Sequence, residues 1–235
     1  MGARSSSPPR TLVIGDVHGC LDELRALVHK AGVTDDDDVV FVGDLVAKGP
    51  DSAGVVSWAR ERGAAAVLGN HDEHVLRALA GDQAAKPAHL AVAATLGKAD
   101  AAWLAALPLW VRPRSGTAAG TASHLVVHGG MVAGVPVEKQ AREHLLTMRS
   151  VAADGKPSKR IEGTPWAAVW PGPEHVVFGH DAVRGLQQHP HATGLDTGCV
   201  YGRELTGLLL PAHKLISVAA RRAYAAMKRR GYGPS

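Results

Sequence analysis

The chain has 235 residues and a mass of 24.5 kDa, which is enough for one sizeable hydrophobic core. A hydrophobic fraction of 46% and a charged fraction of 20% are typical of a soluble globular protein and exclude a fibrous or wholly disordered chain. Lys and Arg exceed Asp and Glu by 26 − 22 = 4, which suits an anionic substrate but is too small an excess to indicate a nucleic-acid-binding protein by itself.

The two ends and the cysteines predict where the domain begins and where the protein works. Residues 1–10 are expected to form a disordered lead-in, residues 11–219 the single main domain, and residues 220–235 a solvated basic C-terminal helix or tail. Cys20 and Cys199 lie far apart, which indicates a reducing compartment without disulfides. With no secretory signal and no membrane-spanning stretch, we expect a cytoplasmic protein without membrane contacts.

Strands and helices alternate in the first half of the chain. Strands are expected over residues 11–16, 39–42 and 64–68, and helices after Gly19, over 52–62, after His71 and within 86–107. The four acids at 35–38 are expected to form a solvated loop rather than a calcium site, because they lack the spacing of calcium ligands. Pro108 should end the last of these helices.

The second half favours strands. A loop over 112–123 should separate the halves, and strands are expected to end at His128 and near His180, with a short one at 194–197 and a hairpin formed by 204–210 and 214–219. Residues 131–173 are the least regular part, with a short helix near 140–148 and a loop over 154–159, where a substrate-covering segment would belong. These patterns predict two packed sheets with helices outside.

Polar side chains follow five of the expected strands at the point where each strand ends. The strand over 39–42 is an apolar run that stops at Gly43 and Asp44, as a strand buried on both faces would. The other four ends carry Gly15-Asp16-Val17-His18-Gly19, Gly69-Asn70-His71-Asp72, His128-Gly129-Gly130 and Phe178-Gly179-His180. Five unrelated strand ends that all carry such residues by chance would be far rarer than one site that uses all five. The sequence therefore predicts a single polar centre on a rigid scaffold.

The residue types at these ends suit two divalent cations. Asp16 and His18 can hold one cation together, and the two oxygens of Asp44 can bridge two. A second position can be completed by Asn70, His128 and His180. Mixed nitrogen and oxygen donors fit Mn, Fe, Zn or Co better than calcium. Two such ions about 3.5 to 4 Å apart clamp a phosphoryl group and activate a bridging water for in-line attack.

These motifs, in this order, resemble the calcineurin-like metallophosphoesterases of the phosphoprotein phosphatase superfamily over about residues 11 to 210. Residues 15–20, 43–50 and above all Leu195-Asp196-Thr197-Gly198-Cys199-Val200-Tyr201-Gly202 look like the bacterial symmetrical diadenosine tetraphosphatases. The resemblance implies an α/β fold, a four-layer α/β/β/α sandwich of two mixed sheets flanked by helices. It also implies symmetrical hydrolysis of diadenosine tetraphosphate to two ADP with two divalent ions, Mn being expected and Co, Fe, Zn or Mg the alternatives.

The resemblance assigns a role to individual residues. Asp16, His18 and Asp44 would hold the first metal; Asp44, Asn70, His128 and His180 would hold the second. His71 would be the general acid that protonates the leaving oxygen. Ala47 stands where protein phosphatases place the Asp that orients this histidine, so the orienting residue is unassigned.

Two cations are candidates for binding the substrate's phosphates. Lys48 stands where the family usually has Arg, and Lys lacks the two-pronged grip of a guanidinium. Arg149 resembles a second phosphate-binding arginine, and its alternative interpretation is a cation on the surface of a helix. Asp72 is expected to cap locally, and Cys20 and Cys199 to be small buried residues rather than nucleophiles.

Other functions stay open at this stage. A serine/threonine protein phosphatase would use the same site, although Ala47 and residues 195–202 speak against it. A nucleoside-tetraphosphate cap on RNA presents the same bond, so 5'-capped RNA is a further candidate substrate, and a non-catalytic nucleotide- or RNA-binding protein is an alternative of another class. The segment between Gly130 and Trp166 is shorter than in the tetraphosphatases, which would loosen selectivity. No obligate protein partner is expected.

Overall fold

A computed structural model describes residues 10–114 and 123–227 of the chain. Its first sheet has the strand order β13-β12-β1-β2-β3. The strands are β1 (Thr11–Ile14), β2 (Asp38–Phe41), β3 (Ala65–Ala66), β12 (Glu204–Leu210) and β13 (Lys214–Ala219). β1, β2 and β3 run parallel, whereas β12 and β13 pair antiparallel, as the predicted hairpin requires.

The third strand is shorter than the sequence pattern over 64–68 predicts. Beyond Ala66, the Val67 amide still bonds the Phe41 carbonyl, but the Leu68 amide donates to the Pro108 carbonyl at 2.8 Å instead. The chain therefore leaves the sheet two residues before the polar Asn70.

The second sheet has the order β10-β11-β9-β5-β4. Its strands are β4 (Trp110–Val111), β5 (His124–Val127), β9 (His175–Phe178), β10 (Gln187–His189) and β11 (Ala192–Gly194). β5, β9 and β11 are parallel, and β4 and β10 are antiparallel edges. The strand expected at 194–197 lies two residues earlier, and β10 is an edge strand that the sequence pattern did not indicate.

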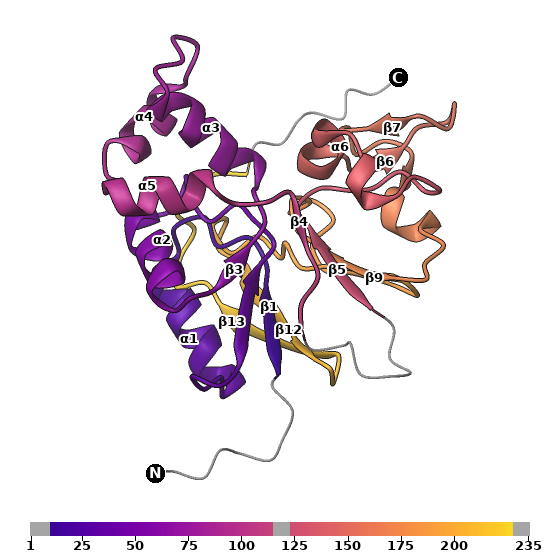
Figure 1. The fold of residues 1–235 in the computed structure, drawn as a ribbon, viewed down its shortest axis with the longest axis horizontal. Coiled ribbons are helices and arrows are strands. Elements are labelled where there is room, and N and C mark those ends of the chain that lie inside the picture. Colours follow the sequence, from indigo (N-terminus) through magenta and orange to yellow (C-terminus); the bar gives the residue numbers. More distant parts are fainter. Residues whose placement is uncertain (1–9, 115–122, 228–235) are drawn as a thin grey trace.

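Helices cover both sheets unequally. On one side lie α1 (Leu21–Ala31), α2 (Ser52–Glu61), α3 (Asn70–Leu79), α4 (Pro87–Ala93) and α5 (Lys98–Ala105) (Figure 1). On the other side lie α6 (Arg142–Thr147), the 3-10 turns η1 (Val137–Lys139) and η2 (Trp166–Val169), and a small sheet of β6 (Ser150–Val151), β7 (Pro157–Ser158) and β8 (Thr164–Pro165). The expected loop over 154–159 thus contains one short strand.

The burial of successive residues in β1 shows the layers. Leu12 and Ile14 pack with Leu24 on the helix-covered face, whereas Val13 packs between the sheets against Val177 and its neighbours. Phe178 faces outward beneath Trp166 and the short helices. Successive side chains thus point to opposite faces of each sheet. The predicted four-layer α/β/β/α fold is confirmed, with a thin fourth layer.

The acidic stretch at 35–38 is not wholly solvated, contrary to the sequence prediction. Asp37 is buried, and its carboxylate accepts hydrogen bonds from the Arg10 Nε at 3.0 Å and from the Thr34 amide at 2.9 Å. The side-chain hydrogen bond from Arg10 lowers the pKa of Asp37 below its ordinary value. This ion pair fixes the start of β1 to the turn before β2.

We expect Asp37→Asn to lower the free energy of unfolding by about 1–2 kcal/mol near pH 7, because the charged hydrogen bonds to Arg10 are weakened. The pKa of Asp37 is depressed in the folded state, so its contribution is complete above the unfolded value near pH 4 and is lost as the pH falls below it. Urea unfolding between pH 3 and 8 would show a constant difference between the two proteins above about pH 4 and a shrinking difference below it. The exposed neighbour variant Asp36→Asn is the control, and an equal loss at every pH would contradict this account.

The C-terminal residues 220–227 contain no helix and do not form a free tail. The Tyr224 amide donates to the Val200 carbonyl at 2.9 Å, and the Arg221 amide donates to the Glu23 carboxylate at 2.9 Å. The segment therefore lies against α1 and the turn before β12. The rest of the predicted C-terminal tail, at 228–235, and the predicted lead-in at 1–9 lie outside the described residues.

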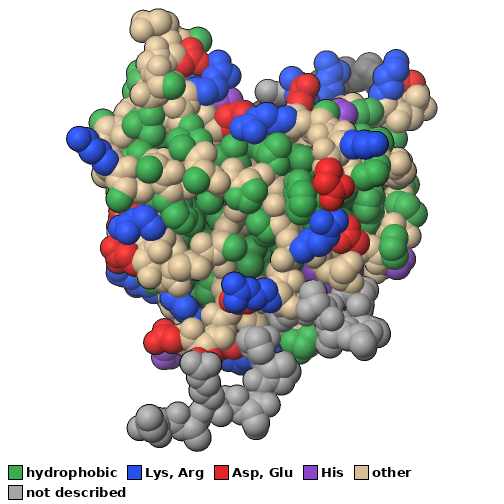
Figure 2. Space-filling model, viewed as in Figure 1, with side chains coloured by type: hydrophobic (Ala, Val, Ile, Leu, Met, Phe, Trp, Pro, Cys, Tyr) green, Lys and Arg blue, Asp and Glu red, His purple; other side chains and the backbone are tan. Residues whose placement is uncertain are grey.

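Charged side chains are dispersed over the face of the molecule that Figure 2 shows. Figure 2 shows Lys and Arg side chains scattered among acidic and uncharged ones over one face, rather than gathered into one stripe. A continuous basic stripe is the usual footprint of nucleic-acid binding. In addition, none of the helices in the described ranges has the length and apolarity that a bilayer crossing demands.

Candidate metal site

The predicted site residues meet at the carboxyl ends of parallel strands from both sheets. Asp16 and His18 follow β1, Asp44 follows β2, and Asn70 follows β3 and opens α3. His128 follows β5 and His180 follows β9 in the second sheet. Because the two sheets pack face to face, these ends form one group, in which ligand atoms of Asp16, Asp44 and His128 lie within 4.8 Å of one another.

Backbone strain is concentrated at these strand ends. His18, Asp44 and His180 have φ values of +47°, +51° and +71°, a left-handed conformation that non-glycine residues rarely adopt. Such strain costs of order 1 kcal/mol or more per residue and is typical of functional sites. A Cβ at Gly179 would collide with Asp16 Oδ1, so glycine is required there for close approach of the strands.

The imidazoles of His128 and His180 direct lone pairs toward Asn70. His128 Nδ1 donates to the Val42 carbonyl at 2.9 Å, and His180 Nε2 donates to the Thr147 carbonyl at 3.1 Å. The nitrogens left without a proton, His128 Nε2 and His180 Nδ1, face Asn70 Oδ1 at 3.0 and 2.8 Å. Three acceptors converge with no proton between them, which is the arrangement that a cation satisfies.

Asp44 divides its two oxygens between two groups of ligands. Its Oδ2 lies 3.4 Å from His18 Nε2, and its Oδ1 lies 3.4 Å from His128 Nε2. His18 Nδ1 donates to the Val46 carbonyl at 3.0 Å, so its Nε2 carries the lone pair that faces Asp44. The carboxylate is thus placed as a bridge between the Asp16–His18 group and the Asn70–His128–His180 group.

The electrostatics of the site are those of a crowded anion cluster. Burial, with the carboxylates of Asp196 and Asp44 nearby, raises the pKa of Asp16 well above its ordinary value. Burial also opposes ionisation of Asp44, but the surrounding imidazoles and Lys48 outweigh it and leave its pKa below the ordinary value.

Burial lowers the pKa of the histidine ligands as well, to about 4 for His18. Neutral imidazoles beside crowded carboxylates are the donors that divalent metals require. The residues present therefore fit two divalent cations. His18, Asp16 and Asp44 would hold one, and Asp44, Asn70, His128 and His180 the other.

His71 lies beside this group. The sequence did not indicate which residue orients its ring. Its backbone amide donates to Asp44 Oδ1 at 2.8 Å, and its ring meets the ring of His18 edge-on at 5.1 Å. Within residues 10–114 and 123–227, no hydrogen-bond partner is found for its buried Nδ1. The ring of His89 from α4 lies 5.6 Å away, so the His71 ring has the imidazoles of His18 and His89 as neighbours in addition to the Asp44 carboxylate.

The two predicted phosphate-binding cations are placed differently. Lys48 Nζ lies 2.8 Å from His18 Nε2 and 5.3 Å from the Tyr201 ring, at the mouth of the metal group. Arg149 donates from Nη2 to the His180 carbonyl at 3.0 Å and from Nη1 to the Lys159 carbonyl. It follows α6 and is only a quarter exposed, so it is not a cation on a helix surface.

Asp72 and Trp166 have structural roles. Asp72 is completely buried, and its carboxylate accepts from the Gly69 and Val46 amides at 2.9 and 3.1 Å, which confirms a local cap and adds a link to the loop after β2. Trp166 is buried against Phe178.

Asp196 was not assigned a role from sequence, although it follows β11 in the same strand-end pattern as the metal residues. Burial raises its pKa to about 6, and Asp16 and Asp44 are among the carboxylates that it faces. The signal that could have found it is its position two residues after a strand. Asp196 is therefore a buried acid that borders the metal group.

A metal-dependent phosphoesterase is the class that this fold and donor set define. The chain belongs to the calcineurin-like phosphoesterase family, whose sequence profile matches residues 9–195. Family membership implies divalent metal ions without specifying which.

Individual relatives are similar over nearly the whole chain. A protein of Bacillus velezensis (strain FZB42) named bis(5'-nucleosyl)-tetraphosphatase PrpE [asymmetrical] is 30% identical, covering 92% of this chain and 95% of the relative. The bis(5'-nucleosyl)-tetraphosphatase, symmetrical, of Aromatoleum aromaticum is 28% identical, covering 88% and 96%. A crystal structure provisionally described as a diadenosine tetraphosphatase is 36% identical, with a TM-score of 0.81, covering 92% and 95%.

Proposed function

We propose that this chain hydrolyses a phosphoanhydride bond of a dinucleoside tetraphosphate such as diadenosine tetraphosphate. The observation that carries the hydrolytic chemistry is the position of Asp44, whose two oxygens face two separate groups of metal ligands 3.4 Å away. The substrate class is supported by the names of the full-length relatives. Two divalent ions, when bound, would neutralise the phosphoryl oxygens and supply an activated water.

The protein's own residues would position the substrate. Lys48 projects beside His18 and is placed to neutralise a phosphate adjoining the metal group. Lys48 also lines a shallow pocket of about 280 Å³ together with Arg222 and Tyr224 from the C-terminal segment. A substrate with four phosphates would extend beyond the metals, and Arg222, in the same pocket as Lys48, is a further cation that could bind it. Arg149 would act mainly by holding the His180 backbone.

His71 would serve as the acid that protonates the leaving oxygen, because it adjoins Asp44 and His18 without being one of the metal donors. Its buried Nδ1 has no partner in the described ranges, so the ring is held by packing against neighbouring imidazoles.

The relatives differ in the position of the bond that their names say they cleave, symmetrical or asymmetrical. The motif at 195–202 favours the symmetrical product, two ADP. The relative named asymmetrical is, however, 30% identical over 92% of this chain, and the one named symmetrical is 28% identical over 88%. On this similarity we propose asymmetrical cleavage to AMP and ATP.

The test is to incubate the manganese-loaded protein with diadenosine tetraphosphate and to separate the nucleotides by anion-exchange chromatography. Equal amounts of AMP and ATP are expected. ADP alone would keep the proposed substrate and reverse the proposed register. No dinucleotide hydrolysis, with rapid phosphate release from a phosphoserine peptide assayed in parallel, would refute the proposed function in favour of a protein phosphatase.

A further inference from the structure

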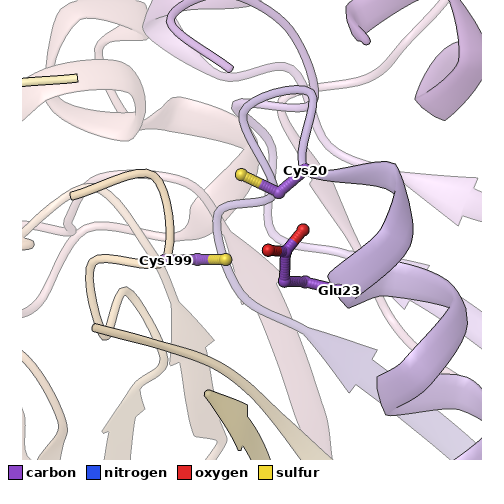
Figure 3. A group of neighbouring side chains, drawn as sticks. All are labelled: Cys20, Glu23 and Cys199. Atoms are coloured by element: carbon purple, nitrogen blue, oxygen red, sulfur yellow. The ribbon is translucent and has the colours of Figure 1, made fainter. Parts of the chain in front are cut away.

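A second cluster of metal-ligating side chains lies outside the site described above. Cys20 precedes α1, Glu23 lies in its first turn, and Cys199 comes from the turn between β11 and β12. The two sulfurs and a Glu23 oxygen all lie within 4.8 Å of one another, and all three residues are at most 2% exposed. Figure 3 shows the Cys199 sulfur and the Glu23 carboxylate directed toward each other, with the Cys20 sulfur beside them.

One carboxylate oxygen in this cluster has no partner. Glu23 Oε1 accepts from the Tyr224 hydroxyl at 2.8 Å and from the Arg221 amide at 2.9 Å. Glu23 Oε2 is buried, and no donor reaches it within the part of the chain that the structure describes. Arg221 directs its guanidinium to the neighbouring Asp22 instead. A buried carboxylate oxygen without a donor is costly unless a cation completes its surroundings.

Burial also excludes the two cysteines from reactions at the protein surface. Both thiols are free and buried, so they are not exposed nucleophiles. The sulfur of Cys20 has a weak 3.9 Å contact with the His18 carbonyl and lies beside the sulfur of Cys199. A side-chain hydrogen bond with Cys20, together with burial, raises the pKa of Cys199 above its ordinary value.

We propose that Cys20, Glu23 and Cys199 form a structural site for a thiophilic divalent cation such as Zn²⁺. Binding would release the two thiol protons to solvent, form two sulfur–metal bonds and one bond to Glu23 Oε2, and leave a fourth position for water. The cation would tie the start of α1 to the turn before β12. The oxygen and nitrogen donors of the main site are harder, so the two sites should select different metals.

The same cluster holds the C-terminal segment. Because Glu23 Oε1 carries the Tyr224 hydroxyl and the Arg221 amide, fixing the carboxylate also fixes residues 221–224 against α1. None of the three residues is a ligand of the main site, but the segment that they hold includes Arg222 and Tyr224, which line the proposed substrate pocket.

The test is a titration of the metal-free, reduced protein with Co²⁺, followed by absorption spectroscopy. Only a thiolate ligand gives an intense near-ultraviolet sulfur-to-cobalt charge-transfer band, so the oxygen- and nitrogen-rich main site is silent in that region. Wild type should develop the band with a single equivalent at the cluster and lose it when Zn²⁺ displaces Co²⁺. The variant Cys199→Ser should have a weaker band, and the double variant Cys20→Ser/Cys199→Ser should lack it.

Glu23→Gln is the milder variant, because a glutamine can keep the acceptor for Tyr224 and Arg221 but cannot supply Oε2. It should weaken Co²⁺ binding at the cluster at least about 10-fold. The control Asp22→Asn, an adjacent acid that faces away toward Arg221, should bind as wild type does. Absence of the band in folded, fully reduced wild-type protein, or affinity unchanged by Glu23→Gln, would overturn the proposal.

Discussion

Replacing Asp44 by Asn is expected to lower kcat/KM by at least about 10³-fold, equivalent to ~4 kcal/mol of lost transition-state stabilisation. The reason is the division of its two oxygens, because an amide offers one oxygen and a nitrogen without a lone pair for metal. The hydrogen bond from the His71 amide can persist, since the asparagine oxygen still accepts it. Loss of activity should therefore reflect loss of the bridge rather than unfolding.

The measurement combines metal content with thermal unfolding. Metal-free Asp44→Asn should stay folded and unfold somewhat below the wild-type temperature, because it loses the attraction of Asp44 to the surrounding imidazoles and Lys48. Added Mn²⁺ should stabilise wild type strongly and the variant little, as expected for a ligand that binds only the folded state. Asp38→Asn, at the opposite end of the same strand, is the control. Full metal content with full activity would remove Asp44 from the bridging role.

Replacing His71 by Asn should slow hydrolysis by an amount that depends on the leaving group. General acid catalysis contributes about 10²- to 10⁴-fold where the leaving oxygen is strongly basic. A phosphoserine peptide leaves as a basic alkoxide, whereas a nucleotide leaves as a weakly basic phosphate. The loss should therefore be largest for the peptide, if it is hydrolysed at all, and smaller for the dinucleotide, while metal content stays at the wild-type level.

A series of aryl phosphates with leaving groups of graded basicity gives the sharpest form of this test. The ratio of wild-type to His71→Asn rates should rise steadily as the leaving phenol becomes more basic. The variant His29→Asn, an exposed histidine on α1, controls for nonspecific loss of an imidazole. A ratio independent of the leaving group would assign His71 a binding or structural role instead.

The sequence by itself determined the strand ends and the chemistry placed at them. Apolar runs that stop at Asp16, Asp44, His128 and His180 predicted buried strands whose ends share one edge. Such a prediction is possible because the spacing of apolar residues, and the glycine or polar residue that ends each run, are local properties of the sequence. The same locality explains the successful prediction of the hairpin after Glu204. The mixed nitrogen and oxygen donors also indicated divalent metal ions, and which metal they hold stays a prediction.

Only the tertiary structure decided which atoms meet. The Asp37–Arg10 pair and the bond from Arg149 to the His180 carbonyl join residues 27 or more positions apart, and the rings around His71 come from separate elements. No local pattern encodes such contacts. Short edge strands such as β10 escaped prediction because their pairing depends on a neighbour more than on their own residues.

The cysteine cluster shows the same limit. Each cysteine reads locally as a small buried residue, and burial is confirmed. Their approach to Glu23 follows from packing α1 against the turn before β12, across 179 positions of the chain. Sequence thus supplied the side chains and the strand on which each sits, and the packing of two sheets and one helix decided which of them became neighbours.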